Sequence, residues 1–476
     1  MRYTITPNDS LNDAVNRLVP GDVLRLEPGT YHEVVTCSLL GTVEQPITIE
    51  GADPDNRPVI DGFAPHDLEE AEAAGVDINY GLPQAKISKR NGNTWSKTYG
   101  ATAASKALFN CEQKSGNYII RNMILQNSLG RIWNHEAAAG DSSRNITFEN
   151  VDMHWSRLQI LSIKNVANVT FRYCNFSHAA SFFQTAYRPT TGPDGDKQTH
   201  NAAISLGNVD GVIMQDCELH DCWGEGIITN ANEGESKKIT IIGFSAWDCY
   251  KTPLYIHASS DVNAGDVLVY RSAENLKYGH SDSTQVDGKD NPVLKTPAIN
   301  IQSSEGDKDW DTSTHDVSVD GLIASYTHSG LSLSGSAGTA PISNISFDGC
   351  TIIEPVGYGL ILKGNKPRFV TVKNNTFYSA DPGKQLGYAI DNRYDNTSDV
   401  DYNNWTTEPD NQFLVGEHDK YWFDLDIKAE PLPAGTTIDD LLKPPELPVE
   451  ITESFHVQGA YWVVTVSENQ VTAVRN

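Results

Sequence analysis

The sequence predicts an all-β fold, a parallel β-solenoid, because short strand signals recur along the chain at a regular interval. Each signal is a β-branched or apolar triplet, and most return after about 23 to 28 residues. A repeat of this length is too short for a propeller blade and fits one coil of a solenoid, in which each coil contacts only its neighbours. The triplets are Ile146–Phe148, Val169–Phe171, Val212–Met214, Ile239–Ile241, Val267–Val269, Val317–Val319, Ile345–Phe347 and Val370–Val372.

A second strand aligns within the repeats and predicts one flat face of the solenoid. Side chains alternate along a strand, so the first and third residues of each quartet should face the core, and the second and fourth should form outward rows. The quartets are Leu161–Lys164, Ile204–Gly207, Ile227–Asn230, Leu254–His257, Ile299–Gln302, Leu331–Ser334 and Leu360–Lys363.

The ends and insertions of the solenoid can also be predicted. Residues 1–394 form the solenoid, and residues 395–476 form a C-terminal cap or tail that ends in a hairpin. Asp9–Leu18 has apolar residues at helical spacing, so we expect a helix that covers the open N-terminal end. Insertions at about 182–200 and 272–296 precede aligned strands and should rise on one edge of the face, making one wall of a groove.

The composition narrows the function classes. The formal net charge of −26 argues against nucleic-acid binding. No apolar run approaches the roughly 18 residues of a membrane span. The start of the chain does not read as a secretory signal, and we expect an extracellular or periplasmic protein whose leader has been removed. The sequence does not define an oligomeric state.

The seven cysteines are predicted to be free thiols inside the coils. Cys174, Cys217 and Cys350 occupy one slot of the repeat, and Cys222 and Cys249 share another. Recurrence at one slot predicts stacking of small buried side chains rather than disulfides or a metal site.

The N-terminal segments Leu11–Leu18, Pro20–Leu26, Pro28–Tyr31 and Pro46–Gly51 resemble the opening of right-handed β-helix polysaccharide lyases of the alginate lyase, chondroitinase B and pectate lyase type. The resemblance implies a right-handed parallel β-helix that acts on carbohydrate through Lys and Arg in a groove, sometimes with Ca²⁺. Ser162–Asn165 resembles the lysine strand of these enzymes. The arginine strand expected one or two coils later is missing, as is the paired-Asp signature of polygalacturonases.

The outward rows bring together the candidate catalytic residues. Tyr255 and His257 lie on one strand and one face, about 6–7 Å apart. Asn230 comes one coil before His257 and Gln302 one coil after, at a coil spacing of about 4.8 Å. Further residues expected to bind the substrate are Lys164, Asn300 and His280.

Elimination from a uronic acid polymer needs a cation beside the carboxylate, a base for the C5 proton and an acid for the departing oxygen. Arg188 or Lys251 could be the cation, and His257, Lys251 or an ionised Tyr255 the base. The acid could be Tyr255, Tyr187 or His200. Histidine has the pKa best matched to neutral pH. The sequence therefore predicts a lyase for an acidic polysaccharide such as alginate or pectate.

Two other readings stay open. A glycoside hydrolase needs two carboxyls about 5–10 Å apart, which Glu225, Asp282 and Asp287 could supply, although none lies on the aligned strand. Glu225 also follows a tight turn as a candidate Ca²⁺ ligand, a general acid or a turn-stabilising carboxylate. The third reading is a surface protein that binds glycans without chemistry.

Overall fold

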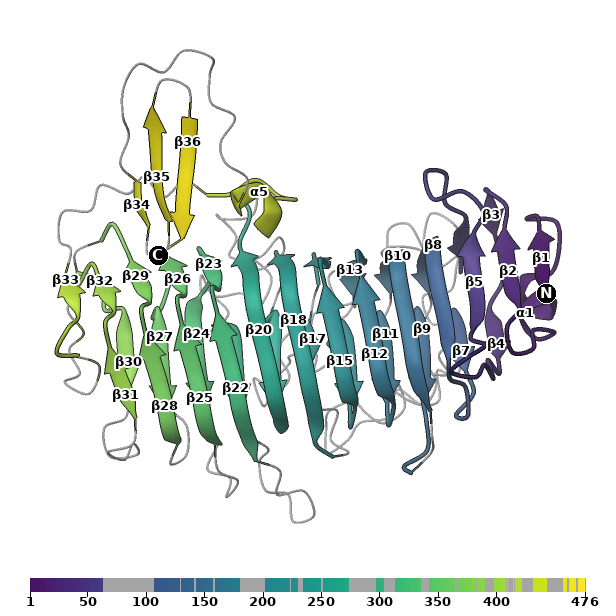
Figure 1. Cartoon of the computed structure of the whole chain (residues 1–476), viewed down its shortest axis with the longest axis horizontal. Helices are drawn as coiled ribbons and strands as arrows, with labels where there is room; N and C mark the ends of the chain where they lie inside the picture. The colour runs from purple at the N-terminus through teal and green to yellow at the C-terminus, as the bar shows by residue number, and fades with distance from the viewer. Residues whose placement is uncertain are drawn as a thin grey trace, which may run out of the picture.

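The computed structural model is a long parallel β-helix, in which two sheets run the length of the molecule (Figure 1). The structure describes residues 1–62, 107–128, 130–140, 143–156, 159–179, 202–222, 224–229, 234–249, 251–273, 297–303, 313–334, 342–363, 367–381, 383–389, 398–407, 409, 414, 416–421, 431–442, 457–459, 462–467 and 470–475.

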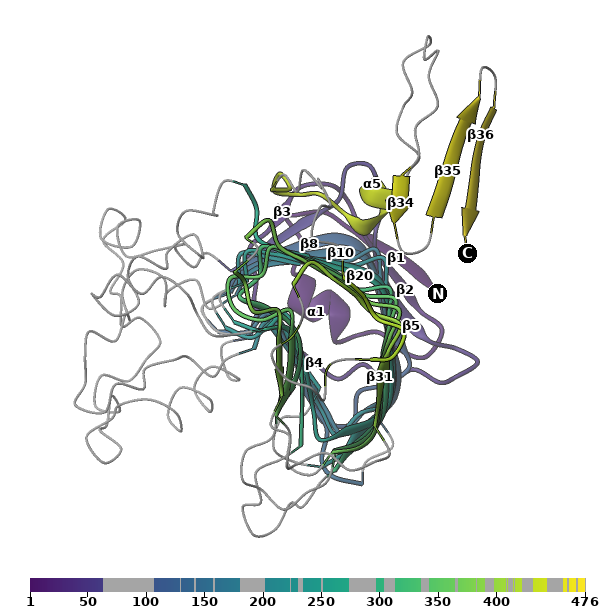
Figure 2. The ribbon, with the colours of Figure 1, turned by 90° about the vertical axis from the view of Figure 1, so that its left-hand side faces the viewer.

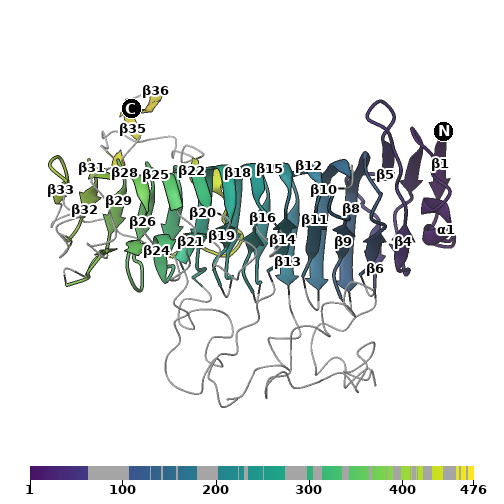
Figure 3. The same cartoon turned by 90° about the horizontal axis from the view of Figure 1, so that it is seen from below.

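Sheet B has eleven described strands, all paired in parallel, and forms one side of the coil (Figure 3). Its register advances one coil at a time, so that Ile227 pairs with Leu254 and Leu254 with Ile299. The strands are β4 (Val35–Cys37), β7 (Phe109–Cys111), β9 (Trp133–Glu136), β11 (Leu161–Lys164), β14 (Ile204–Gly207), β17 (Ile227–Ile228), β19 (Leu254–His257), β21 (Pro297–Gln302), β24 (Ser329–Ser334), β27 (Leu360–Lys363) and β30 (Gly387–Ala389).

Sheet A has twenty-two described strands and wraps around the rest of the coil through a bend. Four long strands run through the bend: β8 (Tyr118–Ser128), β10 (Arg144–Ser156), β18 (Ser236–Trp247) and β20 (Ser259–Tyr270). Before it lie β1 (Arg2–Ile5), β2 (Val23–Leu26), β5 (Ile47–Gly51), β12 (Ala167–Arg172), β15 (Asp210–Gln215), β22 (Thr314–Asp320), β25 (Ile342–Asp348), β28 (Arg368–Lys373) and β31 (Asp399–Asp401). After it lie β3 (Thr30–Tyr31), β6 (Val59–Asp61), β13 (Asn175–Ala179), β16 (Glu218–His220), β23 (Ile323–Ser325), β26 (Thr351–Ile353), β29 (Thr376–Tyr378), β32 (Asn404–Trp405) and β33 (Lys420–Tyr421).

Residues in the left-handed conformation make the bend in sheet A. Asn122, Asn150 and Asn374 adopt φ values of 56°, 52° and 56° there. Asparagine tolerates this conformation better than most residues because its short polar side chain bonds locally. The Asn150 side-chain amide donates to Asn122 Oδ1 at 3.0 Å, one coil away. The bend is therefore repeated in place from coil to coil.

The core is a continuous column of apolar side chains from both sheets. Aromatic rings stack along it: Phe148 and Phe171 have centroids 5.3 Å apart and are nearly parallel. Phe377 and Trp405 stack at 4.2 Å in the last coils. The rings stack because the strand register repeats from coil to coil, so the apolar side chains of one coil pack on those of the next.

The helix expected within Asp9–Leu18 is α1 (Leu11–Val15), with Ser10 as its N-cap. The Ser10 hydroxyl accepts from the backbone N–H of Asp13, and Leu11, Ala14 and Val15 are buried. In the view along the helix axis α1 lies within the outline of the coils, at their N-terminal end (Figure 2).

The C-terminal segment packs back on the outside of sheet A. Helix α5 (Ile438–Leu442) contacts β18 and β20. The Tyr270 hydroxyl donates to the Pro433 carbonyl at 3.0 Å, and the Ile438 N–H donates to Ser245 Oγ at 2.8 Å. Strands β34 (Val457–Gly459), β35 (Trp462–Ser467) and β36 (Gln470–Arg475) form a separate antiparallel sheet.

The strand predictions are mostly confirmed, but one triplet was assigned to the wrong slot of the repeat. Val267–Val269 lies after the bend of β20, and Val262–Ala264 occupies the slot that pairs with Val317–Val319. One strand carries both segments, and the later one has the stronger β-branched signal.

Strands β31, β32 and β33 continue sheet A beyond residue 395. The domain division at 394/395 stays a prediction. The predicted insertion at about 182–200 lies outside the described residues, as does the one at about 272–296 except for Ser272 and Ala273.

The cysteine prediction is confirmed, since all seven are free and six are buried. Burial raises the pKa of Cys350 to about 12, which keeps the thiol protonated. The slot of Cys350 passes to Asn375 and then Asn403 in the following coils.

Asn375→Ala should lower the free energy of unfolding by about 2–4 kcal/mol, because two buried backbone groups lose their partners. The Asn375 side chain accepts from the Cys350 N–H at 2.8 Å and donates to the Phe347 carbonyl at 3.0 Å. Denaturant titration measures the loss. Asn263→Ala, at an exposed strand position, is the control and should change little. Equal stability of both variants would contradict the role of this side chain.

Candidate functional site

The outer face of sheet B carries Tyr255 and His257 on β19. Both side chains are half-buried, and the alternating residues Leu254 and Ile256 are buried in the core. The two rings stack, with centroids 5.4 Å apart and planes 28° from parallel. The predicted placement of a phenol and an imidazole side by side on one face is therefore confirmed.

A chain of hydrogen bonds extends from Tyr255 into the following coils. The Tyr255 hydroxyl donates to Gln302 Oε1 at 2.8 Å, and Asn300 Nδ2 approaches the same oxygen at 3.4 Å. Ser334 Oγ donates to Asn300 Oδ1 at 2.6 Å. His257 and Gln302 are register partners. Together these five side chains, the sheet B polar row, present hydroxyl, imidazole and amide groups on one surface.

Lys251 does not belong to this surface. Its side chain is only 4% exposed, and its Nζ lies 2.9 Å from Glu225 Oε1. This buried ion pair turns the Lys251 amine away from Tyr255 and His257 and towards Glu225. The structure thus sets Lys251 and Glu225 apart from Tyr255 and His257, and the roles predicted for these two residues stay predictions.

A second polar cluster lies on the same face, nearer the N-terminus, around Glu136. Glu136 Oε1 accepts from Arg131 Nη1 at 2.8 Å and from Ser162 Oγ at 2.9 Å, and Lys164 Nζ lies 3.5 Å away. Arg131 also donates to Gln159 Oε1 at 2.7 Å. The sequence analysis found Lys164 but not Arg131 or Glu136. Glu136 could have been found from the strand alignment, because it is the register partner of Lys164 on β9.

The electrostatics of this cluster favour the ionised carboxylate. Burial alone would raise the pKa of Glu136, but the charges of Arg131 and Lys164 and the hydrogen bonds outweigh it and lower the pKa. Burial lowers the pKa of Arg131, which the charge of Glu136 partly offsets. The cluster is an ion network in which Glu136 contacts two cations, Arg131 and Lys164.

Several predicted site residues lie outside the described residues. They are Tyr187, Arg188, His200, Asn230, His280, Asp282 and Asp287. Their predicted roles stay predictions.

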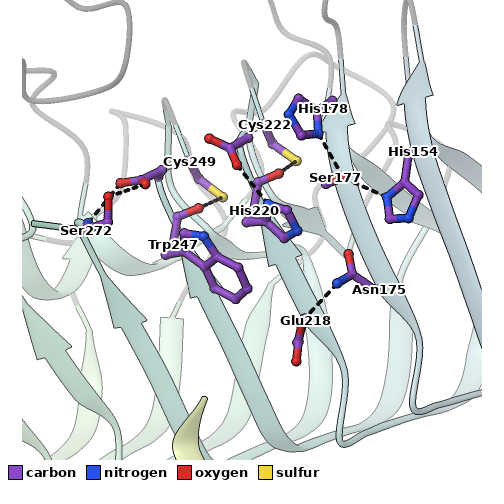
Figure 4. A network of polar contacts seen from close by, with 12 residues as sticks. His154, Asn175, Ser177, His178, Glu218, His220, Cys222, Trp247, Cys249 and Ser272 are labelled. Carbon is purple, nitrogen blue, oxygen red and sulfur yellow. Dashed lines mark hydrogen bonds and ion pairs between the residues drawn. The ribbon is translucent and has the colours of Figure 1, made fainter. Parts of the chain in front are cut away.

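A cleft of about 610 Å³ lies on sheet A, beyond the bend. It is lined by the carboxylates Asp152, Asp216 and Glu218, and by Asn175, which stands between Asp152 and Glu218 in the register. Asn175 Nδ2 donates to Glu218 Oε2 at 2.9 Å (Figure 4). The Asn175 Oδ1 atom is buried, and in the described chain no donor reaches it.

The two outer carboxyls of this cleft differ in acidity. Burial would raise the pKa of Asp152, but contacts with His154 and Arg57 lower it. Burial raises the pKa of Glu218, and the charge of His220 only partly opposes this. One carboxyl is therefore biased towards the anion and the other towards the acid, a pattern that acid–base chemistry can use.

A ladder of aromatic rings runs beside the cleft (Figure 4). Trp155 stacks on His178 at 3.9 Å, and His220 stacks on Trp247 at 4.4 Å with planes 3° apart. Trp247 also stacks on Tyr270, beneath the C-terminal segment. The ring faces are occupied by one another, so the ladder stiffens the coils and offers few free faces for a sugar to stack on.

The described residues contain no group of three His, Cys, Asp or Glu side chains that could hold a metal ion. A Ca²⁺ requirement stays a prediction of the resemblance. Among the described helices, none has the length and apolar character that crossing a bilayer requires.

The family described as a right-handed β-helix region matches residues 108–290. The chain thus has the predicted fold, a right-handed parallel β-helix. No curated protein sequence matches the chain.

Solved structures with similar coils include enzymes of more than one class. A pectate lyase shares 12% sequence identity with this chain. The match covers 84% of this chain and 79% of the pectate lyase chain, with a TM-score of 0.36. The A-module of a mannuronan C-5 epimerase from Azotobacter vinelandii shares 13%, covers 82% and 92%, and has a TM-score of 0.42. The catalytic unit of an α-1,3-glucanase from Streptomyces thermodiastaticus shares 9%, covers 90% and 71%, and has a TM-score of 0.41. At these values no reaction follows from the similarity.

Glu136→Gln should lower the free energy of unfolding at neutral pH by about 1–3 kcal/mol, because it leaves the buried Arg131 without its counter-charge. The folded pKa of Glu136 is below its ordinary value of 4.5, so the carboxylate stabilises the fold above that pH, and this stabilisation is lost on acidification. The difference between wild type and variant should therefore shrink in acid.

Thermal unfolding at neutral and acidic pH measures both effects. Glu149→Gln is the matched control, since Glu149 is more exposed and lies 4.0 Å from Arg121. A stability difference that is the same in acid as at neutral pH would contradict the ion-network account.

Proposed function

We propose that the protein is a polysaccharide lyase that cleaves a uronic-acid-containing polymer such as alginate or pectate by β-elimination on the outer face of sheet B. The observation that carries the proposal is the stacked pair Tyr255 and His257, half-exposed on a rigid strand and held by the hydrogen bond to Gln302. An acid and a base on one strand keep fixed positions, which proton transfer requires. An extracellular or periplasmic location stays a prediction.

The proposed step is a proton transfer at each end of the broken bond. His257 takes the proton from C5 of the uronate, the C4–O bond breaks, and a C4–C5 double bond forms. Tyr255 gives its hydroxyl proton to the departing oxygen. In the structure this proton is donated to Gln302 Oε1 at 2.8 Å, so it must turn from Gln302 to the departing oxygen when substrate binds.

Lys164 and Arg131 serve binding rather than the chemical step in this proposal. β11 and β19 are three strand spacings apart in sheet B, about 14 Å at 4.8 Å each. A cation at that distance cannot neutralise the carboxylate whose C5 proton His257 removes. Its proposed role is to contact another uronate of the same polymer, since Lys164 lies on the same face of sheet B as Tyr255.

A glycoside hydrolase is the second candidate, and the sheet A cleft is the observation that favours it. Asp152 and Glu218 are two coils apart in register, about 10 Å between their backbones. Inverting glycosidases separate their two carboxyls by roughly 6.5–9.5 Å. Opposite pKa directions at the two carboxyls match the required acid and base.

His257→Ala should lower kcat by about 10²–10⁴-fold, because it removes the base. Tyr255→Phe should have an effect of similar size, with KM changed little in both variants. The ultraviolet absorbance of the unsaturated uronate measures the rate. His315→Ala changes a half-buried histidine on β22 of sheet A, is the control, and should keep the wild-type rate. Wild-type rates in the His257 and Tyr255 variants would refute the placement of the site.

Glu218→Gln distinguishes the two candidate functions. For the lyase, the variant should form the unsaturated product at the wild-type rate. For the hydrolase, wild type should release reducing ends without ultraviolet absorbance, and the variant should lose this activity. The wild-type hydrolytic rate should also fall as pH rises through the raised pKa of Glu218, because the acid must be protonated.

A further inference from the structure

The turn position at the bend of sheet A keeps one backbone conformation in ten described coils. Its φ values lie between 49° and 69°, in the left-handed region that glycine, asparagine and aspartate tolerate best. Eight of the ten residues are of these types, and the other two are Tyr173 and Tyr402. The ten positions are Asn122, Asn150, Tyr173, Asp216, Gly243, Asp266, Gly321, Gly349, Asn374 and Tyr402.

The two tyrosines of this slot differ in what they contact. The Tyr402 ring stacks on His418 with centroids 4.5 Å apart, and Lys373 Nζ lies 5.9 Å from its centroid. Tyr173 is 57% exposed, and among the described residues its ring makes no stacking contact and its hydroxyl no hydrogen bond. A bulky residue in a strained conformation, without such contacts in return, indicates a role outside the fold.

Tyr173 lines the cleft of about 610 Å³ on sheet A. This volume is typical of pockets that bind small molecules. Thr437, directly before α5, lines the same cleft, and the next residue, Ile438, is held by the hydrogen bond of its N–H to Ser245 Oγ at 2.8 Å. The C-terminal segment therefore supplies part of the wall, and Tyr173 is the aromatic residue of the lining.

The polar side chains of the cleft mostly accept hydrogen bonds. Asp216 and Glu218 line it, and an ionised carboxylate only accepts. Asp152 lies in an ion pair with Arg57, so its charge is already compensated. A ligand that fits must therefore bring donors, together with an apolar face to lie on Tyr173. A sugar ring meets both requirements, because its hydroxyls donate and its C–H face packs on an aromatic ring.

We propose that this cleft is a second glycan site, which binds an uncharged polysaccharide and stacks one of its sugar rings on Tyr173. Polyuronates are disfavoured here, since their carboxylates would face those of Asp216 and Glu218. The site is separate from the proposed lyase site, because it lies on sheet A and Tyr255 lies on sheet B. The inference concerns binding, and it holds whether or not the bound glycan is hydrolysed.

The test measures binding of uncharged hexasaccharides of glucose, mannose and galactose by isothermal titration calorimetry. Wild type should bind at least one of them, and Tyr173→Asn should weaken this binding about tenfold or more, because the stacking ring is removed. Tyr402→Asn makes the same exchange in the same slot, seven strand spacings or about 34 Å away, and is the matched control. It should leave the affinity unchanged. Failure of wild type to bind any of the three would overturn the proposal, as would equal affinity in wild type and Tyr173→Asn.

Two further measurements separate ligand binding from a structural role. Asparagine suits the left-handed conformation, so Tyr173→Asn should melt at the wild-type temperature or above it. Tyr173→Phe keeps the ring and should bind the hexasaccharide as wild type does. A melting temperature well below wild type with unchanged affinity would make Tyr173 a structural residue and overturn the proposal. A loss of affinity in Tyr173→Phe as large as that in Tyr173→Asn would overturn the stacking contact.

The outcome also separates this inference from the lyase. Tyr173-dependent binding without unsaturated product from any polyuronate supports the cleft and refutes the lyase. Unsaturated product with no binding of an uncharged hexasaccharide supports the lyase and refutes the cleft. The uncharged hexasaccharide should not compete with the polyuronate, and competition would contradict two separate sites. Binding of a glucosamine hexasaccharide alone would mean a site for cations and overturn the assignment to an uncharged sugar.

Discussion

The parallel backbone ladder between coils is the constraint on which the rest of the structure depends. It keeps one register over the described length of both sheets, so a side chain on one coil meets the residue at the same slot of the next. A slip of one residue would turn every core side chain of that strand outwards. Stacked phenylalanines, asparagines at the bend and thiols in one slot all follow from this constraint.

The same ladder builds the functional surface. Polar side chains at the outward positions of β9, β11, β19, β21 and β24 form a line along the helix axis, and each position is fixed by the backbone rather than by a loop. The described part of the C-terminal segment packs on sheet A, through Tyr270 and Ile438, and not on this line. A linear polymer lying along the axis would meet Glu136 with its cations, then Tyr255 and His257, then Asn300.

Much of this surface could be predicted from the sequence, because two patterns are visible in it. Apolar and polar residues alternate along each strand, and the strands recur once per coil. The quartet Leu254–His257 and its alignment with Ile299–Gln302 were sufficient to place Tyr255, His257 and Gln302 together. The ion pair of Lys251 could not be predicted, because its partner Glu225 is 26 residues away and outside any strand. Arg131 was not predicted for a similar reason, because it precedes β9 and lies outside any strand. The strand segments after the bend of sheet A were not predicted, because in long strands such as β10 the segments before and after the bend follow each other without a break.

The most direct test of the account is the position of a bound uronate oligosaccharide, determined by crystallography of the complex. The account predicts sugar density along the outer face of sheet B, with one ring against Tyr255 and His257. Density confined to the cleft between Asp152 and Glu218, with the face of sheet B bare, would contradict it.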